Sequence, residues 1–342
     1  MIRSSSLRFV FLASIATLSA VSVAACSSSS TPPGATPAAD SGTSTDAALD
    51  APPSDAPAGD AGPTYADPTT NDPIPSDLPV LFARTADPGA ADVPPDLGCA
   101  GTPLPTSKGP LSDHVFHLSN LGGTDADRVH GARVELFFSG DPRGTPDVTA
   151  ITKTGTTPSD PDDGTFVGSV PSSFVTSHVP KMTDYVETTQ LDVDLREPQP
   201  HGLSDTPQSN ADVIGALIGG STYKPTPGKT RIIVSVLDCQ NRPLAGVHLS
   251  LQLDGAVVPI TTTDVRRNYF GDSRLPGNGK WTSRAGIVAF IEVPSNAKSM
   301  LLVGRAKLTA TSAPTVVVSR PLLALPDGVI TALVNPYAHA AL

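Results

Sequence analysis

The chain has 342 residues, with 33 acidic side chains against 23 lysines and arginines and a formal net charge of −10. An acidic chain of this kind argues against nucleic acid as a partner and against electrostatic adhesion to anionic lipid. Aromatic residues make up 5% and charged residues 16%, and there are 36 prolines, a composition that favours β-strands joined by turns.

The first 25 residues have the pattern of a secretory signal peptide. Arg3 and Arg8 provide a basic n-region, Phe9 to Val21 is an apolar run, and small residues follow up to Ala25. The apolar run is shorter than the ~20 residues that a membrane-spanning helix needs. We therefore predict an exported protein whose residues 1–25 are removed.

The run Val23-Ala24-Ala25-Cys26 resembles a bacterial lipobox. That resemblance implies that Cys26 carries a diacylglyceryl thioether and an N-acyl chain such as palmitate, and that it becomes the first residue of the mature lipoprotein. More than one acyl chain is needed for a stable anchor, and this modification provides it. Ser27, which stands where an Asp would favour retention in the inner membrane, implies the outer membrane. The alternative is an ordinary signal peptide cut after Ala25, with an incidental cysteine.

Residues 26–75 are predicted to be a disordered tether behind the lipidated cysteine. The segment consists mainly of Ser, Thr, Pro, Ala, Gly and Asp, with seven aspartates and no Lys or Arg. Too few apolar side chains are present to offset the entropy lost on ordering. Asp72 is the last of these seven aspartates and is expected to belong to the tether.

From Ser76 onward, apolar and polar residues alternate with a period of two, which is typical of half-buried antiparallel strands. In His248-Leu249-Ser250-Leu251-Gln252-Leu253 this pattern predicts a leucine face toward the core and a polar face, including His248, toward solvent. Candidate strands are residues 115–121, 133–138, 147–154, 165–170, 174–179, 191–195, 231–237, 248–253, 286–293, 300–309, 315–319 and 328–335. We predict an all-β fold with two β-sandwich domains, at residues 76–205 and 224–342.

Residues 206–223 are predicted to join the domains through one short helix. Ser209 or Asn210 is the expected N-cap, Asp212 lies in the expected first turn, and Gly219-Gly220 ends the helix. A weak internal repeat, in which residues 131–136 match residues 246–251, suggests two copies of one β-unit.

The stretch Val234-Ser235-Val236-Leu237-Asp238-Cys239-Gln240-Asn241-Arg242-Pro243-Leu244-Ala245-Gly246-Val247 resembles the carboxypeptidase regulatory-like domain. The resemblance covers about residues 225–336 and, more weakly, 97–200. It implies a transthyretin-like or Ig-like β-sandwich in a secreted lipoprotein, a fold that generally supplies a folding or binding module and not a peptidase.

Cys99 and Cys239 remain once Cys26 is assigned to the lipid. In an exported chain, a disulfide between them and two separately buried thiols are both open alternatives. Two cysteines without CxxC spacing do not suggest zinc, and we predict no metal site and no cofactor.

Several short motifs resemble known sites but lack the context that those sites need. Gly228-Lys229-Thr230 resembles the tail of a P-loop but precedes a strand, and Gly271-Asp272-Ser273 resembles a lipase/esterase nucleophile motif without its later Asp-x-x-His. The run Asp160 to Gly164 offers oxygen ligands but does not have EF-hand spacing, so a hairpin turn is favoured over calcium.

The remaining candidates are scattered histidines, tyrosines and one acid–amide pair. His114 and His117 are expected on opposite faces of one strand. Three tyrosines were compared with the iron ligands of intradiol dioxygenases, and Glu292 and Asn335 with isopeptide-forming domains. The tyrosines are Tyr223, Tyr269 and Tyr337.

The sequence thus predicts no catalytic residue. We expect a non-catalytic lipoprotein that presents β-sandwich modules at the cell envelope, held to the membrane through Cys26, with an envelope polysaccharide or protein as partner and no nucleic acid. The alternatives are an enzyme of unknown type, hydrolase or intradiol-dioxygenase-like, that uses a cleft in or between the sandwiches, and a carbohydrate-binding or adhesion module.

Overall fold

The computed structural model describes residues 72–84, 91–105, 109–121, 127–156, 160–196, 200–261, 264–277 and 279–339, all of them in one compact unit. The predicted signal segment, Cys26 and all of the predicted tether up to Asn71 lie outside the described residues.

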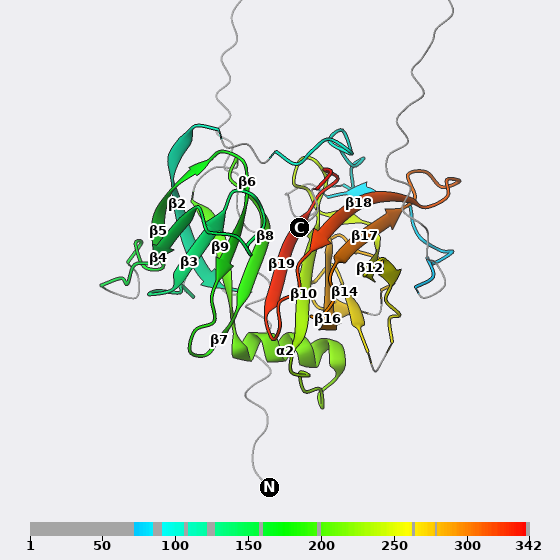
Figure 1. Ribbon diagram of the computed structural model, residues 1–342. Helices are drawn as coiled ribbons and strands as arrows, with labels where there is room; N and C mark the ends of the chain where they lie inside the picture. The colour runs from blue at the N-terminus through cyan, green and yellow to red at the C-terminus, as the bar shows by residue number, and fades with distance from the viewer. Residues whose placement is uncertain are drawn as a thin grey trace, which may run out of the picture. The chain divides into compact units, whose positions relative to one another are not determined.

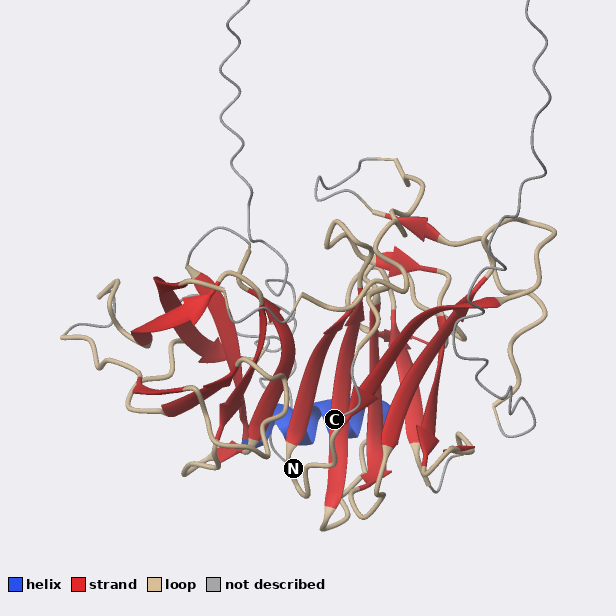
Figure 2. Ribbon diagram, turned by 45° about the horizontal axis from the view of Figure 1, so that its top comes forward, coloured by secondary structure: helices blue, strands red, loops and turns tan. Residues whose placement is uncertain are grey.

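The fold is all-β, as predicted, and its central feature is a nine-stranded sheet in the order β15-β14-β16-β10-β19-β8-β6-β3-β4 (Figures 1 and 2). The strands are β3 (Arg133–Phe137), β4 (Val148–Ile151), β6 (Phe174–Val179), β8 (Thr188–Asp194), β10 (Lys229–Val236), β14 (Arg266–Phe270), β15 (Pro276–Gly277), β16 (Ile287–Pro294) and β19 (Val329–Val334). We call β2–β9 the first half and β10–β19 the second half. The parallel pair β8–β19 joins the two halves in one sheet.

Two four-stranded sheets complete the sandwiches, and a two-stranded sheet links the N-terminal segment to the second half. The first has the order β5-β2-β9-β7, with β2 (Leu111–Asn120), β5 (Thr165–Pro171), β7 (Tyr185–Val186) and β9 (His201–Pro207). The second has the order β13-β12-β17-β18, with β12 (His248–Leu253), β13 (Ala256–Val257), β17 (Met300–Ala306) and β18 (Thr315–Leu322). The pair is β1 (Phe82–Ala83) with β11 (Leu244–Ala245).

The two halves repeat one topology. The order β4-β3-β6-β8 recurs as β13-β12-β17-β18. In the set β5-β2-β9 the middle strand pairs antiparallel on one side and parallel on the other, and β16-β10-β19 does the same. The matching segments 131–136 and 246–251 lead into β3 and β12, which hold equivalent places, so the internal repeat corresponds to repeated structure.

Each half buries its own hydrophobic core. In the first half Phe116 and Phe166 stack with ring centroids 4.8 Å apart, between side chains of both facing sheets. In the second half Leu249 and Leu251 of β12 pack toward Ile232 and Phe290 of the nine-stranded sheet. Burial of these apolar side chains is the main term that stabilises the sandwiches.

The sequence of Leu191 to Leu195 predicts a regular strand in which apolar and polar residues alternate, but the structure interrupts this alternation. Asp192 has φ 60°, and the β6–β8 register shifts between Val175 and Ser177, so β8 carries a bulge. Leu191 therefore joins the core of the second half while Val193 joins that of the first. Two residues that would share one face of a regular strand serve two cores.

The predicted helix is α2 (Gln208–Gly219), and it lies along the ends of strands from both halves (Figure 1). Its end at Gly219, followed by Gly220 at φ 94°, is confirmed. The predicted N-cap is wrong: the helix begins one residue after Pro207, no side chain caps it, and Asp212 lies beyond the first turn. A Cβ on Gly215 would lie 2.4 Å from the Tyr223 ring, which explains a glycine inside a helix.

The segment just before Ser76 belongs to the folded unit, so Asp72 does not behave as a tether residue. The Asp72 carboxylate forms a two-bond ion pair with the guanidinium of Arg267 and lies 3.5 Å from His248. It is only 7% exposed. The expectation that His248 faces solvent is wrong for the same reason, because the N-terminal segment lies over that face and leaves His248 2% exposed.

Cys99 and Cys239 are joined by a disulfide, with Cα atoms 5.7 Å apart. The bond ties the N-terminal segment to the turn that follows β10. Of the two alternatives left open by the sequence, the structure has the bonded one. Within the described ranges, no helix has the length and apolar character that a membrane crossing requires.

Candidate functional site

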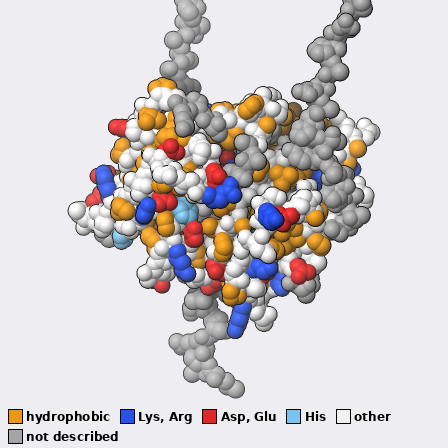
Figure 3. Space-filling view, viewed as in Figure 1, with side chains coloured by type: hydrophobic (Ala, Val, Ile, Leu, Met, Phe, Trp, Pro, Cys, Tyr) orange, Lys and Arg blue, Asp and Glu red, His pale blue; other side chains and the backbone are white. Residues whose placement is uncertain are grey.

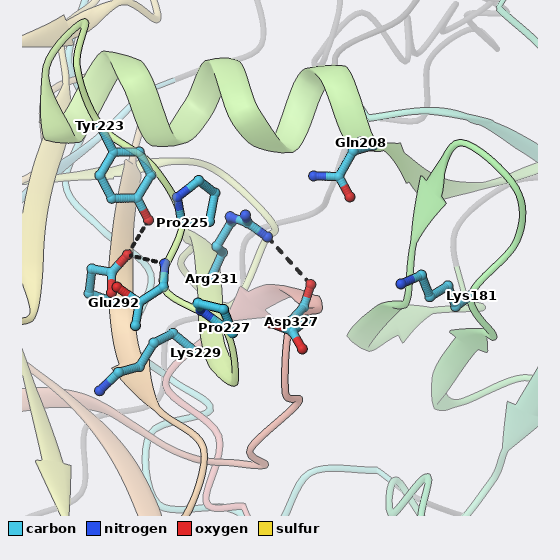
Figure 4. A pocket seen from close by; sticks show the side chains of 10 residues that line it. Lys181, Gln208, Tyr223, Pro225, Pro227, Lys229, Arg231, Glu292 and Asp327 are labelled. Carbon is cyan, nitrogen blue, oxygen red and sulfur yellow. Dashed lines mark hydrogen bonds between the residues drawn. The ribbon is translucent and has the colours of Figure 1, made fainter.

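The candidate site is a pocket of about 210 Å³ at one end of the nine-stranded sheet (Figure 4). Tyr223, Thr226 and Glu292 line one side, and Lys229 and Arg231 of β10 line the floor. Residues from the first half and from the start of α2 close the opposite side, together with the turn before β19. These are Lys181, Gln208 and Asp327.

A bulge in β16 creates the pocket wall. The β10–β16 register shifts between Thr230 and Ile232, and Glu292, on the facing strand, has φ 61°. A residue other than glycine rarely adopts this conformation, and such outliers concentrate at functional sites. Bulges next to a site redirect a side chain, and here the bulge turns Glu292 out of the sheet pattern and toward Tyr223.

The Glu292 carboxylate is held by protein donors. It accepts a short hydrogen bond from the Tyr223 hydroxyl and one of 3.2 Å from the backbone N–H of Thr226. Burial alone would raise the pKa of Glu292, but the hydrogen bonds from Thr226 and Tyr223 outweigh it and the pKa is lowered. Burial, followed by the bond to Glu292, raises the pKa of Tyr223 well above its usual range.

Arg231 is the most unusual side chain of the site. The residue is 5% exposed, and its Nε has no hydrogen-bond partner among the described residues. Its Nη1 donates a long hydrogen bond of 3.4 Å to the backbone carbonyl of Asp327, and its Nη2 lies 3.9 Å from the half-exposed carboxylate of Asp212. A buried guanidinium with so few acceptors is unusual, because desolvation of a charge is normally offset by close partners.

These groups suit binding better than acid–base catalysis. A general acid or base works best with a pKa near the operating pH. Tyr223 and Glu292 have their pKa values moved in opposite directions away from neutrality, so the tyrosine holds its proton and the glutamate stays ionised. The lining instead offers N–H donors and cationic groups to a bound molecule.

The motifs set aside in the sequence are turns or strand residues. In the Asp160 to Gly164 run, the carboxylates of Asp160 and Asp163 accept hydrogen bonds from Thr156 and Gly155, as in a hairpin turn. Gly271-Asp272-Ser273 is a turn in which Asp272 accepts from the N–H of Arg284. Lys229 starts β10 directly after Gly228, so no helix follows the P-loop-like residues.

The histidines do not gather around one point. His114 Nδ1 lies 2.8 Å from His201 Nε2, and the two rings stack inside the first half. His201 was not singled out in the sequence. The described residues hold no group of three or more His, Cys, Asp and Glu side chains placed to hold a metal ion.

The three tyrosines lie in different surroundings. Tyr223 lines the pocket, Tyr269 is buried and donates to the backbone carbonyl of Leu249, and Tyr337 packs edge-on against Phe174. They therefore do not form one ligand set.

Glu292 and Asn335 are also apart. Glu292 lies near the start of β10, where Val293 pairs with Thr230, whereas Asn335 follows Val334, which pairs with Val236 at the far end. An isopeptide centre that includes both is excluded.

Sequence reasoning missed the pocket as a site. The sequence suggests Glu292 only as a member of an isopeptide pair, and Arg231 only as the first residue of the candidate strand 231–237. The available signal was the single charge of Glu292 inside the apolar run Ala289 to Val293; Arg231 follows the polar residues Lys229 and Thr230 and has no comparable signal. Elsewhere, on the face shown in Figure 3, basic and acidic side chains are interspersed.

The chain matches no family model and no curated protein. Among solved structures it is similar to "The Bacillus anthracis TIE protein", with 11% identity and a TM-score of 0.20 over 67% of this chain and 34% of that one. It is also similar to "Structure of the Streptococcal ancillary pilin", with 12% identity and a TM-score of 0.18 over 66% of this chain and 68% of that one. The chain spans about a third of the length of the first.

Proposed function

We propose that the protein is an exported lipoprotein, anchored through Cys26, that presents a non-catalytic β-sandwich binding module at the cell envelope. Export is supported by the leader pattern of residues 1–25 and, independently, by the Cys99–Cys239 disulfide. Disulfides persist in oxidising compartments outside the cytosol. This bond is the single observation that carries the proposal.

The location follows from the lipobox resemblance. Cys26 would carry the acyl chains, and Ser27 behind it favours the outer membrane. The carboxypeptidase regulatory-like resemblance, which stays part of the proposal, also favours a folding or binding module.

The binding role is supported by the way both halves meet at the pocket. Lys181 comes from the first half, Gln208 from the start of α2, and Lys229 and Arg231 from β10 of the second half. One continuous sheet and α2 fix these elements relative to one another, which is how a preformed ligand pocket is held. An envelope polysaccharide or protein is the proposed partner.

The test is fractionation of cells that express the full chain. The unaltered protein is expected in the membrane fraction after a high-salt wash, and Cys26→Ser in the soluble exported fraction. Ser27→Ala, which keeps the cysteine, is the matched control and should stay with the membrane. Ser27→Asp should move the protein toward the inner membrane. Retention of the Cys26→Ser protein in washed membranes would overturn the proposal that Cys26 anchors the chain.

A further inference from the structure

We propose that the Arg231 pocket binds the carboxylate of a compact, hydroxylated monoanion, the chemistry of an acidic sugar unit. This deepens the proposed binding role, because it names the ligand class of the same pocket. It does not depend on the lipid anchor, since each pocket residue lies in the folded unit.

The first argument is the state of Arg231. Arginine has five N–H donors, and Arg231 makes one long hydrogen bond within the described chain. Two other arginines show the usual arrangement: Arg320 forms two bonds to Asp192, and Arg267 forms two to Asp72. The guanidinium of Arg231 faces the pocket, where it can meet an acceptor (Figure 4).

The second argument is the charge around it. Lys181 and Lys229 line the same pocket, and neither forms an ion pair with a described residue. The first residue of α2, Gln208, also lines it, so the positive end of the 12-residue helix lies at the pocket edge. Three cationic side chains and a helix N-terminus line one pocket, which favours an anion.

The third argument limits the ligand to one negative charge. Glu292 and Asp327 line the pocket as carboxylates, and their oxygens already accept bonds from Tyr223, Thr226 and Gly228. The three cations are balanced by these two acids and by Asp212, whose carboxylate lies 3.9 Å from Arg231, so no excess positive charge is left for a second negative charge on the ligand. A dianion would face both acids, whereas the two oxygens of a carboxylate match the fork of one guanidinium.

The fourth argument concerns size and polarity. A volume of about 210 Å³ holds on the order of seven waters at about 30 Å³ each, comparable with a single sugar unit. The side chains of Gln208 and Thr226 supply neutral donors and acceptors beside the charged groups. Such groups are suited to hydroxyls, so the ligand is expected to carry hydroxyl groups next to its carboxylate.

The test is a titration of the full-length Cys26→Ser protein in which binding is monitored by calorimetry and by the NMR chemical shifts of the pocket amides. Sodium glucuronate is the probe, glucose is the neutral counterpart, and glucose 6-phosphate is the phosphorylated one. We expect glucuronate to bind, glucose to bind at least tenfold more weakly, and the phosphate not to exceed glucuronate.

Variants separate the pocket from the rest of the surface. Lys229→Gln and Lys181→Gln are each expected to weaken the binding of glucuronate about tenfold, and Arg231→Gln is expected to abolish it. Lys224→Gln, an exposed lysine outside the lining, should have no effect. Because Arg231 is buried, the binding result for Arg231→Gln is used only if this variant still unfolds cooperatively. If it does not, the two lysine variants decide whether the ligand lies in the pocket.

The proposal would be overturned by no binding of glucuronate at millimolar concentration, by equal affinity for glucose, or by tighter binding of the phosphate. Equal affinity of Lys229→Gln, Lys181→Gln and the parent protein would also overturn it, because the ligand would then lie elsewhere. None of these results bears on membrane anchoring, which fractionation tests separately.

Discussion

Asp192 of β8 and Arg320 of β18 form a bidentate ion pair between the two halves of the molecule, with Nε–Oδ2 at 2.6 Å and Nη2–Oδ1 at 3.0 Å. Both side chains are 3% exposed, and His339 lies 3.6 Å from the same carboxylate. Asp192 is the residue whose positive φ creates the bulge in β8. The pair thus links the strand that serves two cores to the outer sheet of the second half.

Removal of one partner of this pair should be strongly destabilising. Arg320→Met leaves a buried carboxylate without its partner, and we expect a loss of about 3–5 kcal/mol in the free energy of unfolding. The double variant Asp192→Asn/Arg320→Met, in which asparagine tolerates the positive φ of residue 192, should recover part of that loss. Urea denaturation measures the free energy of unfolding of the parent protein and of each variant.

The matched control is Arg143→Met. Arg143 makes the same two-bond geometry with Asp141 at an exposed site, where ion pairs contribute at most about 1 kcal/mol. Equal losses for Arg320→Met and Arg143→Met would contradict the role assigned to the buried pair.

Reduction of Cys99–Cys239 should destabilise the fold. The bond closes a sequence separation of 140 residues, and removal of a native disulfide typically costs about 2–5 kcal/mol. Cys99→Ser/Cys239→Ser is expected to unfold at lower urea concentration than the oxidised protein. Non-reducing mass spectrometry establishes the bond, and an unchanged midpoint after reduction would show that it contributes nothing.

Asp72 should contribute more to the thermal stability of the protein than Asp77 does. Burial would raise the pKa of Asp72, but hydrogen bonds from His248 and Arg267 outweigh it and lower the pKa to about 2. Asp72→Asn leaves Arg267 without its counter-charge, and we expect a fall of the thermal midpoint by several degrees. Asp77, whose partner Lys280 is exposed, is the control. Equal midpoints for Asp72→Asn and Asp77→Asn would place residue 72 outside the folded unit.

His201 should make stability depend on pH. Burial, and then the neighbouring His114, lowers the pKa of His201 to about 4 from the ordinary 6.5. The unfolded chain therefore binds more protons between these values, so the contribution is fully present above pH 6.5 and is lost as the pH falls toward 4. The pH dependence of unfolding should be shallower in His201→Gln over this interval. Parallel curves would refute the assignment.

Gly215→Ala should destabilise the helix instead of stabilising it. Alanine is normally favoured over glycine inside a helix by about 1 kcal/mol. Here the new Cβ would lie 2.4 Å from Cε1 of Tyr223, so the ring must move. In a Tyr223→Ala background the same change should stabilise the protein. Thermal unfolding of the four proteins measures this coupling, and a stabilising effect in both backgrounds would contradict the packing of Tyr223 on α2.

The strands that the sequence predicted are those whose side chains alternate. β3, β5 and β12 have apolar residues on one face, and their positions agree with the candidates within a few residues. β9 was missed because His201 to Pro207 has one leucine among polar residues, and its burial depends on hydrogen bonds such as that from the Thr206 N–H to Thr188. β14 was missed because Arg266 and Arg267 occupy its start and find their partners far along the chain.

The pocket could not be predicted for a similar physical reason. The bulge at Glu292 depends on a register shift against β10, and the partial isolation of Arg231 depends on α2 and on the turn at Asp327. These are relationships between segments far apart in sequence. A charged residue inside an apolar strand indicates that a partner must exist, but the sequence does not say which one.

Lipidation of Cys26 is tested by the mass of the N-terminal peptide of the mature protein purified from membranes. We predict a peptide that begins at Cys26 and carries a diacylglyceryl group and an N-acyl chain. An unmodified Cys26 peptide, or a mature chain that begins at another residue, would show that the protein is not anchored through Cys26.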